Sequence, residues 1–345
     1  MSRAAGEAGE AKPAAQLPDP GRFWIRYVPR SWEPPERPWL NLAAGRLGEW
    51  QKGSRTRTGE IPDFADAVLD DVLYLPPVPQ SRAAARDELA RVLLVAGTPI
   101  LIQLLPGDET TLAPAAGAAF VFDLLHVLLE RDLSSLRRLP SGAAAVWPLL
   151  PGLTDEPELW DLGCRELAAA GVRCVQGLAP ALEPADRRWL AERWGREGTF
   201  DALFHRQPPA ERDFARAAHR HGLEPFLSRP LAPQPRTGSG NRWIGGVVAL
   251  TGELWLRLGR SVEQGQAFYR AARWIDRSSY DLEALAREKN LAVLPLDPAS
   301  REIVAECAAT GESEQLARLL AEYVAPAETG ADESRRTADA QTVET

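Results

Sequence analysis

The hydrophobic pattern of the chain repeats a strand, a turn and a helix, most clearly between Ala143 and Trp160. This stretch begins with an apolar run, AAAVWPLL, which is followed by the turn signal Pro-Gly. Asp155 then precedes Glu158 with the spacing of a helix capping box. The pattern predicts a buried strand, a turn and a helix from about Glu156, and the next apolar strand is expected at Val172.

Similar units lie on both sides of this stretch, and no GxGxxG motif opens a helix after an early strand. Strands that alternate with amphipathic helices pair in parallel and connect by right-handed crossovers. The fold expected is therefore α/β, a full or partial (β/α) barrel of parallel strands with a mainly helical C-terminal extension. The other expected strands are 72–75, 98–105 and 223–227, and the other expected helices of the barrel are 81–95, 115–130, 184–194 and 210–221.

The pattern changes after Pro235, where helical periodicity dominates and a late strand is expected only at 291–296. The expected C-terminal helices cover residues 243–258, 262–275, 282–288, 300–308 and 313–323. Both ends of the sequence are polar and lack periodicity, so we expect them to be disordered. The resulting division is a tail at 1–20, a Trp/Pro-rich arm at 21–60, a barrel-like domain at 61–235, a helical region at 236–325 and a tail at 326–345.

Composition narrows the choice of compartment and partner. The formal net charge of −8 argues against a general nucleic-acid or anionic-membrane binder, although a local basic patch is compatible with it. The three cysteines form no CxxC pair, and the N-terminus lacks the apolar core of a signal peptide. The most apolar helix candidate contains Asp123 and His126 and reads as buried rather than membrane-spanning. We therefore expect a cytoplasmic protein without a membrane partner, with nucleic acid disfavoured as a partner.

The residues around Pro151-Gly152-Leu153-Thr154-Asp155, together with the Ala170-Gly171-Val172 step, resemble the later βα units of radical S-adenosylmethionine enzymes. The resemblance covers about a third of the chain and implies a barrel of that type. Those enzymes hold an iron–sulfur cluster with three closely spaced cysteines, CxxxCxxC. Here nine residues separate Cys164 from Cys174, and Cys307 is remote in the sequence. The resemblance therefore implies a divergent barrel without the cluster, and no metal or cofactor is expected.

Polar residues after the strands are the candidate chemistry, because ligands gather at the carboxyl ends of the strands of a parallel barrel. The word LLPG occurs twice, and carboxylates follow it at Asp108 and Asp155. Paired carboxylates suit acid/base work, but Asp155 also suits a helix cap and Asp108 a solvated turn. Gln103 lies within an apolar strand and needs a buried hydrogen-bond partner, in either a pocket or an internal network. Gln103 and Gln176 are both expected to bind the ligand. His205 is a candidate general base or metal ligand or, alternatively, a lone partly buried histidine.

A Gly-rich loop before the helical region is the best candidate for a ligand site. Backbone N–H groups at a helix N-terminus bind anions, and arginines lie nearby in the sequence. The alternative is a flexible linker between the two regions. The residues expected to bind the ligand here are Arg229, Gly238, Ser239, Gly240 and Asn241.

Two functions follow from these patterns. The first is a divergent barrel that binds a small anionic metabolite or nucleotide at the carboxyl ends of its strands, with Asp108, Asp155 or His205 supplying any catalysis. Its reaction, and whether there is one, are not specified. The second is a non-catalytic scaffold or accessory subunit. Its partner surfaces would be the helical region and the arm that carries Trp24, Trp32 and Trp39.

Overall fold

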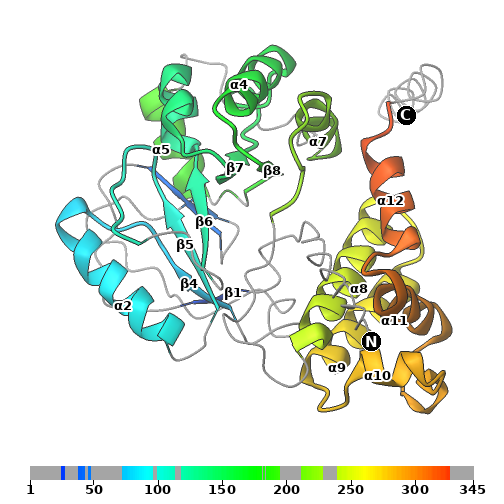
Figure 1. Cartoon of the computed structure of the whole chain (residues 1–345). Helices are drawn as coiled ribbons and strands as arrows, with labels where there is room; N and C mark the ends of the chain where they lie inside the picture. The colour runs from blue at the N-terminus through cyan, green and yellow to red at the C-terminus, as the bar shows by residue number, and fades with distance from the viewer. Residues whose placement is uncertain are drawn as a thin grey trace, which may run out of the picture.

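The computed structural model of the chain is a mixed α/β protein with a parallel sheet and a helical C-terminal region (Figure 1). It describes residues 25–27, 38–42, 46–47, 72–95, 99–112, 118–180, 182, 184–194, 211–227 and 239–326. The sheet has six strands in the order β1-β4-β5-β6-β7-β8, and each neighbouring pair is parallel. Their bounds are Ile25–Tyr27, Val72–Leu75, Ile100–Leu104, Ala118–Asp123, Ala144–Pro148 and Cys174–Leu178.

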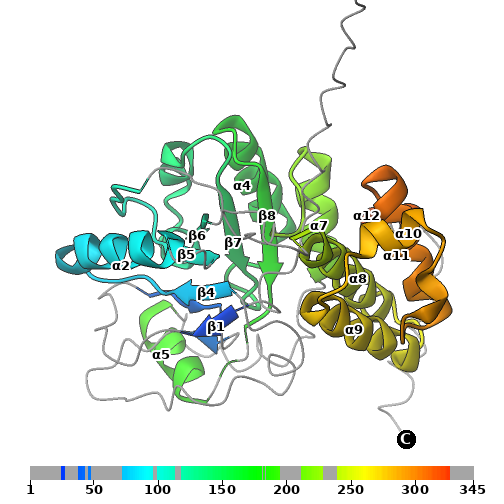
Figure 2. The ribbon, with the colours of Figure 1, turned by 60° about the horizontal axis from the view of Figure 1, so that its bottom comes forward.

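The order of the strands in this sheet follows their order in the chain. Each connection therefore places the next strand beside the previous one, without the reversal that marks a doubly wound sheet. The expected strand at 223–227 appears only as a parallel bridge between Cys174 and Glu224, which continues the same order beyond β8. Figure 2 shows that the sheet is strongly twisted, with β1 and β4 running across the direction of β7 and β8.

One face of the sheet is covered by helices that follow its strands. They are α2 (Ala83–Val95), α3 (Leu125–Leu129), α4 (Pro157–Ala169) and α7 (Glu211–Arg220). The core on this side centres on Trp147 of β7, which is fully buried and lies 5.3 Å from the ring of Phe214. Gly163 of α4 makes room for this indole, since a Cβ there would lie 2.4 Å from the Trp147 ring.

The opposite face of the sheet packs against the N-terminal arm, α5 (Pro184–Trp194) and the helical region. The arm contributes the buried side chains of Leu40 and Leu42, and α5 contributes Leu190. Leu40 belongs to a short antiparallel pair of β2 (Leu40–Asn41) and β3 (Arg46–Leu47). Figure 2 shows α5 on the side of the sheet away from α2 and α4.

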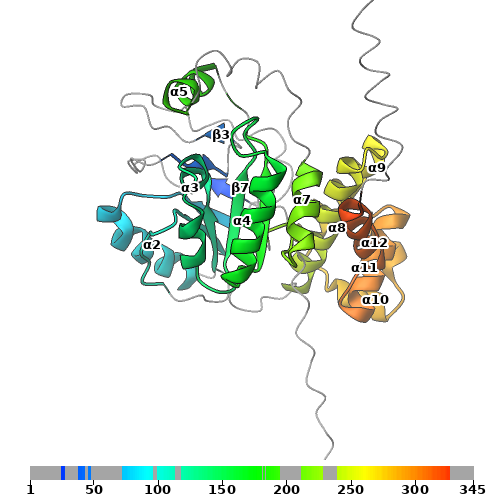
Figure 3. The ribbon, with the colours of Figure 1, turned by 90° about the horizontal axis from the view of Figure 1, so that it is seen from above.

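The helical region has five α-helices among the described residues, and four of them have an N-cap side chain that accepts a backbone N–H of the first turn. Their bounds are α8 Ser239–Arg257, α9 Val262–Arg277, α10 Leu282–Arg287, α11 Pro298–Thr310 and α12 Glu314–Val324. The N-cap residues are Ser261 for α9, Asp281 for α10, Asp297 for α11 and Ser313 for α12. Figure 3 shows α8 between α9 on one side and the α11–α12 pair on the other.

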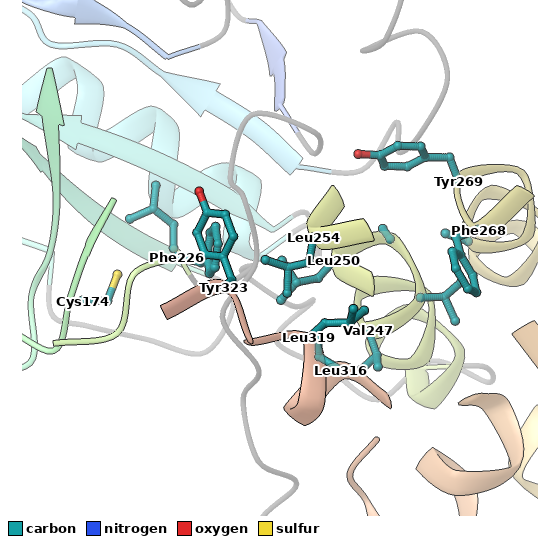
Figure 4. Close-up of a cluster of buried hydrophobic side chains, with 14 of the residues drawn as sticks. Cys174, Phe226, Val247, Leu250, Leu254, Phe268, Tyr269, Leu316, Leu319 and Tyr323 are labelled. Carbon is teal, nitrogen blue, oxygen red and sulfur yellow. The ribbon is translucent and has the colours of Figure 1, made fainter. Parts of the chain in front are cut away.

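The helical region joins the sheet through a shared hydrophobic core and through charged groups. Figure 4 shows Cys174 of β8 and Phe226 beside Tyr323 of α12, and Leu250 and Leu254 of α8 continue the same cluster. The rings of Phe226 and Tyr323 lie 5.7 Å apart. Two regions of different secondary structure therefore share one apolar core.

A group of charged side chains, here called the α7 junction, ties the same elements together. Arg257 of α8 pairs with Glu211 at the start of α7 and with Glu253, 2.5 Å away. Glu253 also accepts a bond from the hydroxyl of Tyr269, and Glu211 accepts the N–H of Ala179 at the end of β8, 3.2 Å away. The junction thus connects the carboxyl end of β8 to α7, α8 and α9.

Three expectations about local structure were wrong. The segment expected as a helix at 115–130 is strand β6 followed by the short helix α3, because its apolar run contains the β-forming sequence Phe120-Val121-Phe122. The late strand expected at 291–296 is instead a 3-10 turn, Leu291–Val293. The capping box expected at Asp155 does not form, since Pro157 starts α4 and the cap residue, Glu156, makes no side-chain bond there.

The strand expected at 223–227 is reduced to the single bridge at Glu224, and the remaining expected strands and helices are confirmed within a few residues. Among the helices that the structure describes, none is both long enough and apolar enough to cross a membrane.

Candidate functional site at the carboxyl ends of the strands

Three neighbouring strands bring polar side chains together near their carboxyl ends. Tyr74 of β4, Gln103 of β5 and Asp123 of β6 are all fully buried. The Tyr74 hydroxyl donates to Gln103 Oε1, and Gln103 Nε2 donates to Asp123 Oδ2 at 2.8 Å. The sequence indicated that Gln103 needs a buried partner, and Asp123 and Tyr74 are those partners.

The N-terminal arm closes this network with its main chain. Leu40 donates its N–H to Asp123 Oδ2 and accepts a 2.6 Å bond from Gln103 Nε2 at its carbonyl. Leu40 is fully buried, and its neighbours Trp39 and Leu42 are each more than nine-tenths buried. The three polar residues, here called the Asp123 network, therefore hold the arm against the sheet.

Asp123 is the most perturbed carboxyl group of this edge. Burial raises its pKa to about 7, although hydrogen bonds from Leu40, Leu125 and Gln103 act in the opposite direction. A carboxyl group of this kind at the end of a parallel strand is a candidate acid or base. The sequence did not single out Asp123, because the expected helix at 115–130 placed it inside a helix rather than after a strand.

Asp108 and Asp155 occupy equivalent turns after β5 and β7, the two LLPG sequences. Asp108 accepts the N–H of Leu105 at 2.8 Å, and Asp155 accepts the N–H of Gly152. The turns need glycine, since Gly107 and Gly152 have φ of 90° and 68°. Because β6 lies between β5 and β7, the two strands are roughly 10 Å apart. The repeated sequence thus produces two separate turns, each braced by its own carboxylate.

A buried ion pair in α2 also holds the loop after β5. Arg86 and Asp87 of α2 pair at 2.8 Å, and Arg86 donates to the carbonyl of Glu109. Burial acts to raise the pKa of Asp87, but hydrogen bonds from Thr111 and Arg86 and the charge of Arg86 outweigh it and hold that pKa below its usual value. This anchor keeps the loop that carries Asp108 in one conformation.

The remaining predicted residues that are described also bond to the main chain. Gln176 of β8 accepts the N–H of Leu227 at 3.3 Å. Asn241 of α8 donates to the carbonyls of Ser278 and Tyr280 and accepts the N–H of Leu282. These bonds hold the loop between α9 and α10 in place.

The start of α8 already faces a carboxylate. A Cβ built on Gly240 would lie 2.4 Å from Oε1 of Glu283. A carboxylate next to the first turn of a helix occupies the position that an anionic ligand would take. Ser239 begins α8, whereas His205, Arg229 and Gly238, like Trp24 and Trp32 of the arm, lie outside the described residues.

The chemistry available at this edge follows from these contacts. Asp108, Asp155, Gln103, Gln176 and Asn241 each hold a main-chain group of the protein itself. Within the part of the chain that the structure describes, no three His, Cys, Asp or Glu side chains are arranged to hold a metal ion. The three cysteines lie on α4, β8 and α11, and burial raises the pKa of Cys164 and of Cys307 to about 12.

Comparison of the chain with models of protein families, with characterised proteins and with solved structures finds no match.

Proposed function

We propose that the protein is a non-catalytic scaffold or accessory subunit, in which the sheet supports a helical region that meets the partner. One observation carries this proposal. The polar side chains found at the carboxyl ends of the strands bond to the protein's own main chain, and Trp39, Leu40 and Leu42 of the arm are buried beside the Asp123 network. A ligand site needs polar groups that point at the ligand rather than at the chain.

The attachment of the helical region supports the same function, because a scaffold must hold its partner surface in a fixed place. Arg212 of α7 donates to the carbonyls of Glu322 and Tyr323 at the end of α12, and Arg216 donates to that of Ala325 at 2.6 Å. Positive groups at the C-terminus of a helix are favourable for its dipole. Together with the α7 junction, these bonds fix α12 and α8 to α7.

We also propose a partial (β/α) barrel fold, a distant relationship to radical S-adenosylmethionine enzymes and a cytoplasmic location. The sequential order of the parallel strands supports a partial (β/α) barrel, and the turn after β7 supports a divergent kinship with radical S-adenosylmethionine barrels that have lost the cluster. Three free, buried cysteines support a reducing compartment such as the cytoplasm. No reaction is assigned to the kinship.

A second candidate function is small-molecule binding centred on Asp123, and the raised pKa of this carboxyl group favours it. Binding would require the ligand to take the place of Leu40 in the Asp123 network. A neutral hydrogen-bonding molecule fits this site better than the anionic metabolite expected from the sequence, because the site itself presents a carboxyl group.

Replacement of the edge residues separates the two functions. If Asp108, Asp155 and Gln176 serve the fold, Asp108→Ala, Asp155→Ala and Gln176→Leu each lower the free energy of unfolding, by about 0.5–1.5 kcal/mol for a lost hydrogen bond. Replacement of a residue that serves ligand binding usually leaves the free energy of unfolding unchanged or raises it. Urea unfolding measures the difference.

The control for this series is Glu109→Ala, which removes an exposed carboxylate beside Asp108. A surface change of this kind is expected to stay within about 0.5 kcal/mol of the wild type. Edge variants that are all as stable as the Glu109 variant would contradict the proposed role of these residues.

A further inference from the structure

Helix α9 has a face that carries three arginines. Arg270, Arg273 and Arg277 are spaced three and four residues apart, so their Cβ atoms follow one side of the helix at intervals of about 5–6 Å. The opposite side of α9 packs against α8 through Phe268 and Ile275, which are fully buried. Gln264 in the first turn of α9 donates to Asp297 at the start of α11, 3.4 Å away, and the arginines lie in the later turns of α9 (Figure 3).

Arg270 and Arg273, two of the three arginines on this face, repel each other. Arg270 is exposed and Arg273 is half-buried. Neither of them forms an ion pair with another of the described residues. Like charges spaced three or four residues apart destabilise a helix by about 0.2–0.5 kcal/mol per pair. A negatively charged partner would relieve this repulsion.

An exposed aromatic ring lies at the end of the same face. Tyr280 is 57% exposed, and it is the one aromatic side chain among the exposed large apolar residues that the structure describes. Its ring stacks on that of Trp274 of α9, with centroids 6.4 Å apart and planes 23° apart. The outer surface of Tyr280 is thus open for a second flat ring to stack on it.

The loop that presents Tyr280 is rigidly held. Asn241 of α8 is only 2% exposed and donates to the carbonyls of Tyr280, at 2.6 Å, and of Ser278, at 3.2 Å. A buried amide with these two bonds fixes the loop just after α9. Asn241, which the sequence predicted as a ligand-binding residue, therefore acts here as a positioning residue for the exposed ring.

We propose that the α9 face, defined as Arg270, Arg273, Trp274, Arg277 and Tyr280, binds single-stranded nucleic acid. The guanidinium groups bind consecutive phosphates, and a base stacks on Tyr280, which is the combination that sequence-tolerant single-strand binding uses. An acidic protein segment would pair with the arginines but has no need of the open ring. The net charge of −8 acts against binding at a distance, so the contact is local and weakens steeply with salt.

This inference names the partner of the helical region and rests on the proposed scaffold function. It is tested by the fluorescence anisotropy of a fluorescein-labelled oligothymidylate of about 12 nucleotides, titrated with the full chain at several salt concentrations. Two variants of equal charge change are compared. One is Arg270→Gln/Arg273→Gln/Arg277→Gln, and the other replaces three exposed arginines elsewhere, Arg138→Gln/Arg165→Gln/Arg318→Gln.

The first triple variant is expected to bind at least about tenfold more weakly and to lower the slope of log affinity against log salt by about 2, since three phosphate contacts are lost. The matched triple variant is expected to retain both values. Tyr280→Ala is expected to weaken binding by about 5- to 150-fold, the loss of one stacked base, whereas Tyr280→Phe restores it.

Three results would overturn the inference. They are no oligonucleotide binding even at low salt, an equal loss of affinity in both triple variants, and full affinity of Tyr280→Ala combined with displacement of the oligonucleotide by polyglutamate. The last result would assign the face to an acidic protein segment. Failure here is distinguishable from failure of the scaffold proposal, because the unfolding of the strand-edge variants does not depend on α9.

Discussion

Arg257→Met is expected to lower the free energy of unfolding by about 3 kcal/mol. Arg257 lies between two carboxylates, Glu211 and Glu253, and the side chains of the three residues are only 12%, 19% and 6% exposed. Removal of the cation leaves two negative charges close together in a place that water barely reaches. The destabilisation caused by two buried, unpaired carboxylates exceeds the net stabilisation that the ion pairs provide.

The size of this effect is measured by urea unfolding against two comparison variants. Arg91→Met breaks an exposed pair with Glu88, whose side chains are 47% and 68% exposed, and is expected to cost at most about 1 kcal/mol. Addition of Glu211→Gln and Glu253→Gln to Arg257→Met is expected to recover part of the loss, because it removes the buried charge. An Arg257 variant no less stable than the Arg91 variant would show that the α7 junction does not hold the two regions together.

Stability is expected to fall by about 2–3 kcal/mol between pH 5 and pH 7 on account of Asp123 alone. Burial raises the pKa of this carboxyl group from 3.8 to about 7 in the folded protein. Between these two values the folded chain holds a proton that the unfolded chain has released. The unfolded state therefore binds fewer protons, and stability declines as pH rises through this window and levels off above about pH 7.

The dependence is isolated by comparing wild type with Asp123→Asn in urea at pH 5 and pH 8. The variant does not titrate, so its deficit relative to wild type should be larger at pH 5 than at pH 8 by about 2–3 kcal/mol. The groups that bond to Asp123 come from Leu40, Gln103 and Leu125 and are uncharged. Glu109→Gln, at an exposed site, serves as the control. A deficit that is equal at the two pH values, or larger at pH 8, would refute the buried, protonated state of Asp123.

The sequence predicts the strands of this protein well where apolar runs are short and bounded. Val72–Leu75 and Ile100–Leu104 are rich in Ile, Leu and Val, and a proline follows each within two residues. Ala118–Asp123 is the exception, because it runs without a break into the apolar residues of α3. An apolar run of that length has no period that distinguishes a strand from a buried helix. Tertiary pairing with β5 and β7 decides the outcome.

The candidate site was predictable only where its bonds are local. Asp108 and Asp155 bond to residues three positions away, so turn chemistry identifies them as structural. Asp123 meets Leu40 across 83 residues and Gln103 across 20. Contacts of that separation depend on the assembled sheet and leave no pattern in the sequence. The need of Gln103 for a buried partner was readable, but the identity of that partner was not.

The face of α9 also combines features that the sequence predicts with contacts that only the folded structure reveals. The positions of its arginines on one side of a helix follow from periodicity, because Phe268 and Ile275 define the buried side. The stacking of Tyr280 on Trp274, and the buried Asn241 that holds its loop, follow only from the packing of α8 against α9. A net charge of −8 argued against nucleic acid for the chain as a whole, whereas the α9 face is a local feature.

The central claim is that the polar residues at the carboxyl ends of the strands hold the chain together and do not hold a ligand. A thermal-shift screen of wild type against nucleotides, S-adenosylmethionine and phosphorylated metabolites tests it most directly. A ligand present at 100 times its Kd would add about 2.7 kcal/mol and raise Tm by roughly 5–10 °C. The account predicts no such shift. A shift of that size that disappears in both Gln176→Leu and Asp123→Asn would contradict it.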